Sequence, residues 1–282
     1  MIHVVCYSGG VSSALVGAMV IQRYGRENTI WINHQVMSEP EDVERFEKEF
    51  ATAHDMEITY VNGDTGKYPK LTPKDVFLAE GAISVKHGGG ENTLCTNRLK
   101  TQPFYDWLEF FHPEELTVYY GFDMEETSRI KTRSGLLGAK GIRTDFPLAF
   151  WTNPLTPNYL KAIKIEKPKQ YEVMKHANCV PCAKGKLQHF LVVYVHRHDL
   201  FNEWAEMEEQ IGHSILPEKY GFLNDIRDYF QQIAETGLPI TEKIPAPRFW
   251  ANIKRALKGK ELLPHADMEM QSDPMLPCEC II

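Results

Sequence analysis

Residues 1–25 read MIHVVCYSGGVSSALVGAMVIQRYG, and this stretch decides the fold. Residues 2–7 form a continuous apolar run, which is typical of a strand buried on both faces of a parallel sheet. Residues 12–24 carry apolar side chains at helical spacing, so a helix follows almost at once. The segment SGGVSS at residues 8–13 therefore predicts a tight turn that leads from a strand into a helix.

The same alternation continues along the chain. Residues 29–33 and 57–61 are further strand-like runs, and residues 39–54 between them have an amphipathic helical pattern. This β-α-β-α-β order predicts an α/β fold with a doubly wound, mostly parallel sheet. We expect this domain to cover residues 1–152, followed by a helical C-terminal region at 153–258 and a cysteine-containing tail at 259–282.

The remaining segments are read from composition and spacing. Residues 62–94 are rich in glycine and polar residues and indicate a loop with one short helix. Residues 97–111 read as a helix, residues 116–120 as a strand and residues 145–150 as a short apolar stretch. Beyond these, helical patterns cover residues 156–164, 168–176, 198–212, 223–236 and 247–258.

Composition limits the class of protein. The chain has 282 residues, of which 43% are hydrophobic and 24% charged, and this suits a globular protein with a sizeable core. A net charge of -7 argues against a broad basic surface that binds nucleic acid, although this charge is compatible with a local basic patch. No apolar run is long enough for a transmembrane helix, and the first strand lacks the basic flank of a signal peptide. We expect a cytoplasmic protein with no membrane partner.

The loop at residues 8–13 is suited to bind a phosphate. Glycines let backbone N–H groups approach an anion, the following helix dipole favours negative charge, and serines add hydroxyl donors. The Walker A pattern is excluded because no lysine follows, and the dinucleotide pattern of three glycines is absent. We expect Gly10 to need a backbone φ that alanine resists; a glycine turn without a ligand is the alternative. The expected phosphate-binding residues are Ser8, Gly9, Gly10, Ser12 and Ser13.

The pattern SGGxxS resembles the PP-loop of the ATP pyrophosphatase (adenine nucleotide alpha hydrolase) superfamily, whose members cleave ATP between its α and β phosphates. Further motifs resemble its phosphoadenosine-phosphosulfate (PAPS) reductase-like branch: CTNRLK at 95–100, GFD at 121–123, Glu126 with Arg129, FPL at 146–148 and NCVPCAK at 178–184. Two departures stand out. Val11 and Ser12 occupy positions where the family carries Lys-Asp or Val-Asp, and the chain ends PCECII instead of the reductase tail Glu-Cys-Gly-(Leu/Ile)-His.

The resemblance implies how the nucleotide is held. Arg98 and Arg129 match family positions, and Lys100, Lys131 and Arg133 flank the same motifs, so these cations are candidates to neutralise the phosphates; for Lys131 and Arg133 a solvated surface position is the alternative. Five more candidates lie where strands end or a helix begins. Asn33 and Gly121 are expected to contact the nucleotide, and His34 is either a further contact or an ordinary strand-end histidine. Asp123 and Glu126 are either ligands of Mg²⁺ or acidic residues of a helix start.

Six cysteines raise the question of a metal. They are Cys6, Cys95, Cys179, Cys182, Cys278 and Cys280. Disulfides are not expected in a reducing compartment, and a C-x-x-C pair with remote thiolates suits zinc or a [4Fe–4S] cluster. The resemblance favours an iron–sulfur cluster on Cys95, Cys179, Cys182 and Cys280, with Cys278 as a weaker candidate for the fourth ligand. Zinc and free cysteines are the alternatives, and Cys6 reads as a buried small hydrophobe.

The resemblance implies an ATP-dependent enzyme. We expect ATP with Mg²⁺ to adenylate an oxygen of an acceptor, and a sulfur nucleophile then to displace AMP, with Arg98, Lys100, Arg129 and Asp123 as catalytic residues. One alternative is a thiol-dependent sulfonucleotide reductase that uses Cys278 or Cys280, and another is a catalytically inactive nucleotide-binding module. The partner classes left open are a nucleic-acid or small-molecule acceptor, a sulfur-donor protein and a second copy of the chain.

Overall fold

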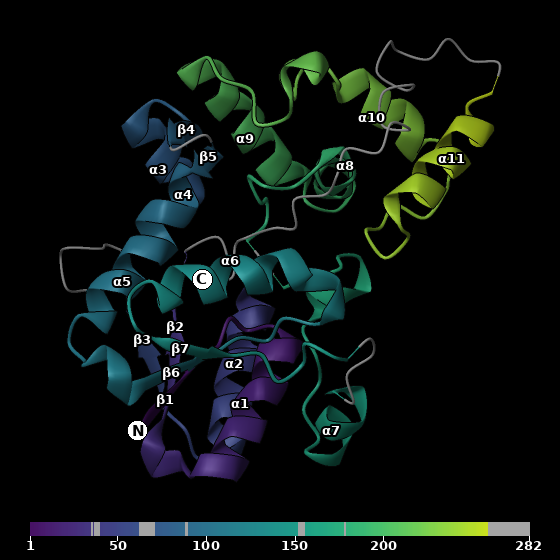
Figure 1. The fold of residues 1–282 in the computed structure, drawn as a ribbon. Coiled ribbons are helices and arrows are strands. Elements are labelled where there is room, and N and C mark those ends of the chain that lie inside the picture. Colours follow the sequence, from purple (N-terminus) through teal and green to yellow (C-terminus); the bar gives the residue numbers. More distant parts are fainter. Residues whose placement is uncertain are drawn as a thin grey trace.

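The computed structural model describes residues 1–34, 36, 40–61, 71–87, 90–151, 156–177 and 179–258. Its centre is a parallel sheet of five strands in the order β3-β2-β1-β6-β7, which confirms the predicted α/β fold (Figure 1). The strands are β1 (Ile2–Cys6), β2 (Thr29–Asn33), β3 (Ile58–Tyr60), β6 (Leu116–Tyr119) and β7 (Arg143–Asp145).

Strand order reverses at β1. Val5 pairs with Trp31 of β2 on one side and with Tyr119 of β6 on the other, and both pairings are parallel. The chain therefore continues from β1 to β2 on one side of the sheet, and from β6 to β7 on the other side. In open parallel sheets the crevice at such a switch point, at the carboxyl ends of the strands, is the usual place for a ligand.

Helices cover both faces of the sheet. Successive strand residues point to opposite faces, so Val5 and Tyr7 pack with α1 (Val11–Tyr24), α2 (Glu41–Ala53) and α7 (Thr156–Ala162). Val4 and Cys6 pack on the other face with α5 (Gln102–Leu108) and α6 (Thr127–Gly138). Cys6 is buried there, as predicted.

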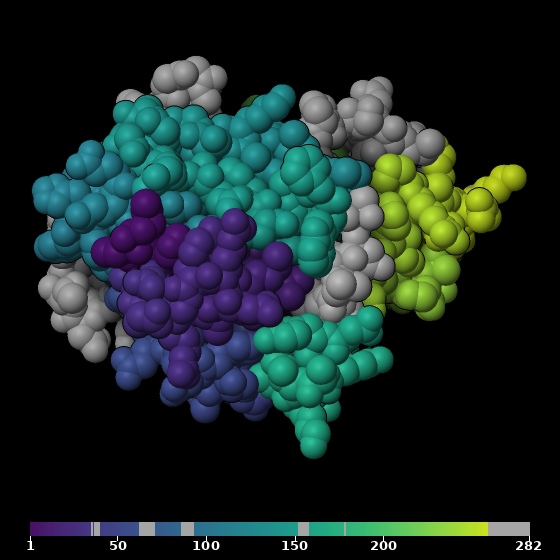
Figure 2. All heavy atoms as spheres, turned by 60° about the horizontal axis from the view of Figure 1, so that its bottom comes forward, coloured from purple at the N-terminus to yellow at the C-terminus, as the bar shows by residue number. Residues whose placement is uncertain are grey.

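The second core is built from helices and includes a segment from the middle of the chain. The helices that contribute to it are α3 (Pro73–Glu80), α4 (Leu94–Thr96), α8 (Leu187–His196), α9 (His198–Ile211), α10 (Arg227–Ala234) and α11 (Ala246–Ala256). Two antiparallel strands, β4 (Ser84–His87) and β5 (Gly90–Thr93), lie between α3 and α4 in the chain. Phe77 of α3 meets Trp204 of α9 edge to face at a centroid distance of 6.0 Å. Residues 73–83 and 94–99 thus pack with the helical region (Figure 1), while the predicted domain boundary at residue 152 stays a prediction. In the space-filling view, α11 projects at the end of the molecule away from the N-terminal segment (Figure 2).

Three local predictions need correction. The segment at 168–176 is not an α-helix, because only the 3₁₀ turn Lys169–Glu172 is helical. The helix expected over 97–111 begins at Leu94 and widens into a π-helical turn at Asn97–Thr101. Pro103 explains the widening, since it has no N–H to donate to the carbonyl four residues earlier. The segment at 62–94 contains the β4–β5 hairpin in addition to one helix.

Short 3₁₀ turns complete the structure at Arg26–Asn28, Pro113–Glu115, Met124–Glu126 and Glu218–Tyr220. Among the described helices, each is too short or too polar to cross a lipid bilayer.

Candidate functional site

The loop between β1 and α1 folds tightly around the first turn of the helix. Ser13 Oγ donates a hydrogen bond to the carbonyl of Gly10 at 2.9 Å and accepts one from the backbone N–H of Ser8 at 3.2 Å. The hydroxyls of Ser8 and Ser13 lie 3.3 Å apart. Gly10 is the N-cap of α1 and has no side chain that could cap the first N–H groups of the helix. These N–H groups point towards the carboxyl edge of the sheet.

The two glycines of the loop have different roles. Gly9 has a φ of 71°, and a Cβ on it would lie 2.7 Å from Val43 Cγ1 and would also collide with the carboxylate of Glu47. Gly10 has a φ of -83°, so the expectation of a special φ at Gly10 is wrong, and Gly9 carries that conformation instead.

The Cβ position of Gly10 is bordered by hydroxyl groups. A Cβ on Gly10 would lie 3.5 Å from Tyr171 Oη, 3.6 Å from Ser8 Oγ and 4.0 Å from Ser13 Oγ. We call these three side chains, Ser8, Ser13 and Tyr171, the hydroxyl cradle. Because it sits at the N-terminus of α1 and at the switch point of the sheet, it combines hydroxyl donors with the positive end of a helix dipole.

Gly121 brings the loop after β6 against the same turn. A Cβ on Gly121 would lie 2.7 Å from the backbone nitrogen of Ser13 and 2.9 Å from the carbonyl carbon of Ser12. A side chain there would displace the first turn of α1, so glycine is required for this approach. The structure thus places Gly121 beside the loop, and its contact with a nucleotide stays a prediction.

Tyr171 reaches the cradle from a distant part of the chain and was missed by sequence reasoning. It belongs to a strap, residues 168–177, that crosses the carboxyl edge of the sheet. The backbone N–H of Lys169 donates to Asp42 of α2 at 2.6 Å, the N–H of Val11 donates to Tyr171 Oη at 3.3 Å, and Lys175 Nζ lies 3.7 Å from Glu125. Burial raises the pKa of Tyr171, so its hydroxyl keeps a proton at neutral pH.

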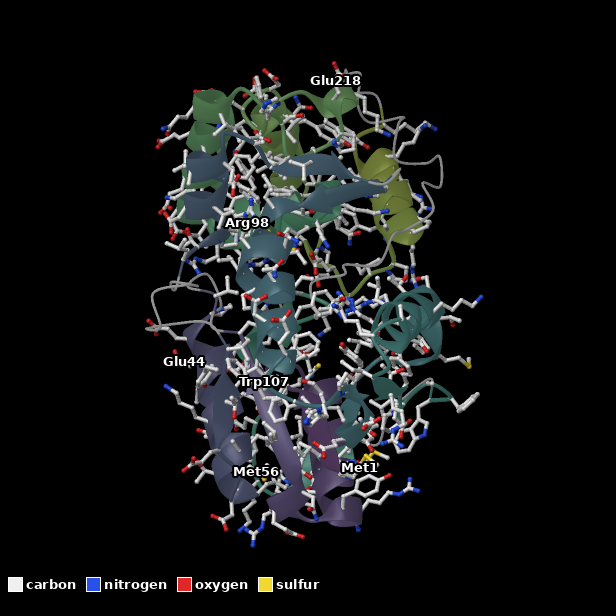
Figure 3. All side chains as sticks on the ribbon, turned by 60° about the vertical axis from the view of Figure 1, so that its left-hand side comes forward. Met1, Glu44, Met56, Arg98, Trp107 and Glu218 are labelled. Carbon is white, nitrogen blue, oxygen red and sulfur yellow. The ribbon has the colours of Figure 1, made fainter. Side chains whose placement is uncertain are left out.

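Arg98 and Lys100 lie on the helix that follows Cys95. The side chain of Arg98 is 52% exposed and forms an ion pair with Glu80 at 2.8 Å. Figure 3 shows it towards the helical region and Glu218, away from Met1 and Met56. Lys100 is half-buried and lies close to His34; burial and the positive charge of Lys100 lower the pKa of His34 well below its usual value. Their assignment as catalytic residues stays a prediction.

Arg129 and Arg133 lie on the inward face of α6. Arg129 pairs with Glu126, and its guanidinium carbon lies 4.2 Å from the centre of the Phe122 ring. Arg133 is 8% exposed, so the alternative of a solvated surface position is wrong for this residue. Lys131, in contrast, is exposed.

The acidic and amide candidates are engaged in local structure. Asp123 accepts the backbone N–H of Glu125 at 2.9 Å, and Glu126 accepts the N–H of Asp123 at 3.2 Å, which makes a capping box at the turn before α6. Asn33 ends β2, as expected, and its amide donates to Glu47 of α2 at 2.6 Å. A role of Asp123 in holding Mg²⁺, or of Asn33 in contacting the nucleotide, stays a prediction.

The C-x-x-C turn is held by a buried histidine that sequence reasoning also missed. Cys179 and Cys182 are both buried, and the N–H of Cys182 donates to His189 Nε2 at 2.9 Å. Since Nε2 accepts, Nδ1 carries the proton and donates to Glu242 at 2.5 Å. Glu242 also accepts the N–H of Lys175 at 3.1 Å, so the strap and the turn share one carboxylate.

The metal prediction is not tested by this arrangement. Cys95 is half-buried and packs against the same core cluster as Cys179. Within the described ranges, no group of three or more His, Cys, Asp or Glu side chains is arranged to hold a metal ion. Cys278 and Cys280 lie outside the described residues. The iron–sulfur cluster and its rival, zinc, remain predictions.

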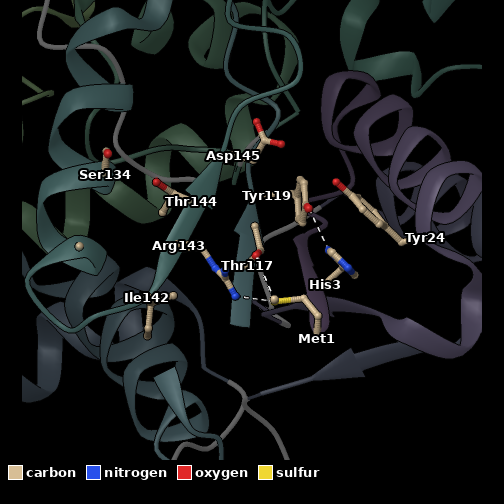
Figure 4. A pocket seen from close by; sticks show the side chains of 11 residues that line it. Met1, His3, Tyr24, Thr117, Tyr119, Ser134, Ile142, Arg143, Thr144 and Asp145 are labelled. Atoms are coloured by element: carbon tan, nitrogen blue, oxygen red, sulfur yellow. Dashed lines mark hydrogen bonds between the residues drawn. The ribbon is translucent and has the colours of Figure 1, made fainter. Parts of the chain in front are cut away.

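A separate hollow of about 760 Å³ lies on the sheet near β7 (Figure 4). His3 donates or accepts a hydrogen bond with Tyr119 Oη at 2.8 Å there and stacks on Tyr24 at the end of α1, with ring centres 3.7 Å apart. Strand residues, the C-terminal end of α1 and the C-terminal half of α6 line this hollow, so it lacks the helix N-terminus that favours an anion at the cradle.

The fold and the loop define a Rossmann-like α/β protein with a five-stranded parallel sheet and a glycine–serine turn at its switch point. No family model, curated protein or solved structure matches the chain.

Proposed function

We propose that the chain is a nucleotide-binding enzyme of the PP-loop ATP pyrophosphatase type, which holds the phosphates of ATP at the loop of residues 8–13. The hydroxyl cradle carries this proposal. Three hydroxyls border the Cβ position of Gly10, at a helix N-terminus and at the switch point of a parallel sheet. A phosphate group there would receive hydroxyl hydrogen bonds and the favourable end of the α1 dipole.

The reaction proposed is adenylation of an acceptor. An acceptor oxygen attacks the α-phosphorus of ATP, a new P–O bond forms, and the bond to the bridging oxygen breaks as pyrophosphate leaves with its electron pair. Such an in-line displacement depends on positioning and charge neutralisation more than on a protein nucleophile. The cradle would position the leaving pyrophosphate, and the buried α6 arginines supply positive charge near the same edge. Asp123 and Glu126 are engaged in their capping box, so this proposal assigns them no metal.

Sulfur transfer is the second half of the proposal, and the cysteine turn supports it. A sulfur nucleophile would attack the carbon that bears the adenylated oxygen. A C–S bond forms, the C–O bond breaks, and AMP leaves with its electron pair. The strap bonds to α1 through Tyr171 and to Glu242 through Lys175, and Glu242 holds His189 against the N–H of Cys182. The buried thiols of Cys179 and Cys182 thus belong to the same bonded framework as the cradle. If a metal cluster binds, these two thiols and Cys95 would hold it and it would supply or carry the sulfur.

Product analysis tests the proposed reaction. The purified protein is incubated with ATP, Mg²⁺ and candidate acceptors, and the phosphorus-containing products are resolved by ³¹P NMR. AMP with pyrophosphate supports the proposal, whereas ADP with inorganic phosphate contradicts it. Sulfite released from a sulfonucleotide would indicate the reductase instead.

A further inference from the structure

We propose that Arg133 is an anion-binding residue that supplies the positive charge for a phosphoryl or sulfuryl group bound in the crevice between β1 and β6. The nucleotide identity of that group rests on the proposed function, but the need for an anion does not. Arg133 lies one helical turn after Arg129 and one before Leu137, and these three residues form the buried face of α6.

Its position is at the switch point of the sheet. The positive charge of Arg133 acts on the thiol of Cys6, the last residue of β1, and on the phenol of Tyr120, which directly follows β6. The same two connections lead into the cradle, because Ser8 follows β1 and Gly121 follows β6. Arg133 on α6 therefore lies near the same edge of the sheet as α1 and the strap.

Arg133 has no counter-charge in the part of the chain that the structure describes. It is 8% exposed, and it forms no hydrogen bond or ion pair with another described residue. Its two electrostatic neighbours are neutral at physiological pH, because burial raises the pKa of Cys6 to about 12 and that of Tyr120 well above its usual value. Arg129, which is equally buried, differs because it pairs with Glu126.

Among the described residues, the side-chain nitrogens that are fully buried without a hydrogen-bond partner do not include those of Arg133, so its guanidinium reaches solvent and is open to a ligand. A guanidinium can give a tetrahedral oxyanion two parallel hydrogen bonds. A purely structural arginine at this position would instead bond to a carboxylate or to backbone carbonyls. The ligand class that fits is therefore a phosphate or sulfate group.

Thermal unfolding with and without inorganic pyrophosphate separates these two roles. Arg133→Met keeps the length of the side chain and removes its charge, Arg133→Lys keeps the charge without the fork, and Arg197→Met is the control at an exposed ion pair with Asp199. Without an anion, Arg133→Met is expected to unfold at the temperature of the wild type or above it. Its affinity for pyrophosphate is expected to fall at least tenfold, with Arg133→Lys intermediate and Arg197→Met unchanged.

A failure of this inference and a failure of the proposed function give different results. If Arg133→Met unfolds several degrees lower and binds pyrophosphate like the wild type, Arg133 is structural and the inference is overturned, while the proposed function stands. If the wild type binds neither ATP nor pyrophosphate, the proposed function fails, and the same variants are compared in inorganic phosphate and sulfate. Stabilisation of the wild type by either ion, lost in Arg133→Met, still supports the inference; no stabilisation of the wild type by any of these anions overturns it.

Discussion

The backbone N–H of Val11 donates a hydrogen bond to the hydroxyl of Tyr171, and this 3.3 Å contact joins residues 160 positions apart. It places the strap across the first turn of α1. The oxygen of a phenol can accept this bond and still donate its own proton. The proton of Tyr171 is thus available to a group bound beside Gly10, whose Cβ position lies 3.5 Å from the same oxygen.

Tyr171→Phe is expected to weaken pyrophosphate binding about five-fold, the effect of one hydrogen bond worth ~1 kcal/mol. Tyr159→Phe is the matched control, because that hydroxyl bonds to His54 at 2.6 Å on the α2 side of the sheet. Calorimetric titration of both variants measures the difference. Equal affinities in the two variants would remove Tyr171 from the binding site.

The two loop glycines give a second prediction. Gly10→Ala is expected to keep or raise the free energy of unfolding, by about 0.5 kcal/mol, because its φ suits alanine and its Cβ meets only ordinary contacts. The methyl group would nevertheless fill the cradle and abolish anion binding. Gly9→Ala is expected to cost more than about 1 kcal/mol, since its φ of 71° and the neighbouring Val43 oppose a side chain. A Gly10→Ala protein that still binds pyrophosphate would show that the anion lies elsewhere.

The cysteine turn gives a third prediction. Anaerobically purified protein is expected to contain iron and to absorb in the visible range, and Cys182→Ser to lose both. His189→Ala is expected to lower the iron content as well, because the turn loses the acceptor of the Cys182 N–H and the tie to Glu242. Cys6→Ser, in the core of the sheet, is the control. Stoichiometric zinc without iron contradicts the cluster, and full metal occupancy in Cys182→Ser contradicts the site.

Glu208 predicts how stability depends on pH in the helical region. Its buried carboxylate accepts the N–H groups of Ile215 and Leu223, both at 2.5 Å, and burial raises its pKa to about 7 from 4.5. The folded protein therefore holds a proton between these two pH values that the unfolded chain has released. Stability conferred by this proton is present at pH 4.5 and is lost as the pH rises to about 7, by about 3 kcal/mol at most.

Glu208→Gln tests this assignment, because glutamine stays neutral throughout. The unfolding midpoint of the wild type is expected to fall relative to that of the variant between pH 5 and pH 8. A difference between the two proteins that stays constant over this range would show that Glu208 does not titrate there.

Strong local patterns made the sheet and the loop predictable. The runs at residues 2–7 and 29–33 are mostly apolar, as is typical of strands covered on both faces, and the glycines between β1 and α1 mark a turn. The spacing of apolar residues did not predict a helix where buried positions carry polar side chains or where every position is apolar. The inward face of α6 carries Arg129 and Arg133 instead of an apolar stripe, so the spacing of apolar residues did not predict this helix, and only the acidic residues before it offered a helix start. Residues 187–194 of α8 are all buried, and the run LVVYV at 191–195 contains three β-branched valines, which conceals a helix.

Some residues of the candidate site could likewise be predicted from the sequence, and others could not. Ser8, Ser13 and Gly121 are set by motifs within a few residues of a strand end, and the sequence indicated them. Tyr171 depends on a tertiary contact with Val11, and the His189–Glu242 bond joins residues 53 positions apart, so no local spacing announces either. The segment around Tyr171 has helical spacing of apolar residues, yet its contacts with α1 and α2 hold it as a strap.

Calorimetric titration of the wild type and of Gly10→Ala with a non-hydrolysable ATP analogue tests the central claim most directly. The claim is that the phosphates of a nucleotide bind in the hydroxyl cradle at the N-terminus of α1. We predict that the wild type binds one analogue per chain and that Gly10→Ala, with unchanged thermal stability, binds none. Equal binding by both proteins, or no binding by the wild type, would contradict it.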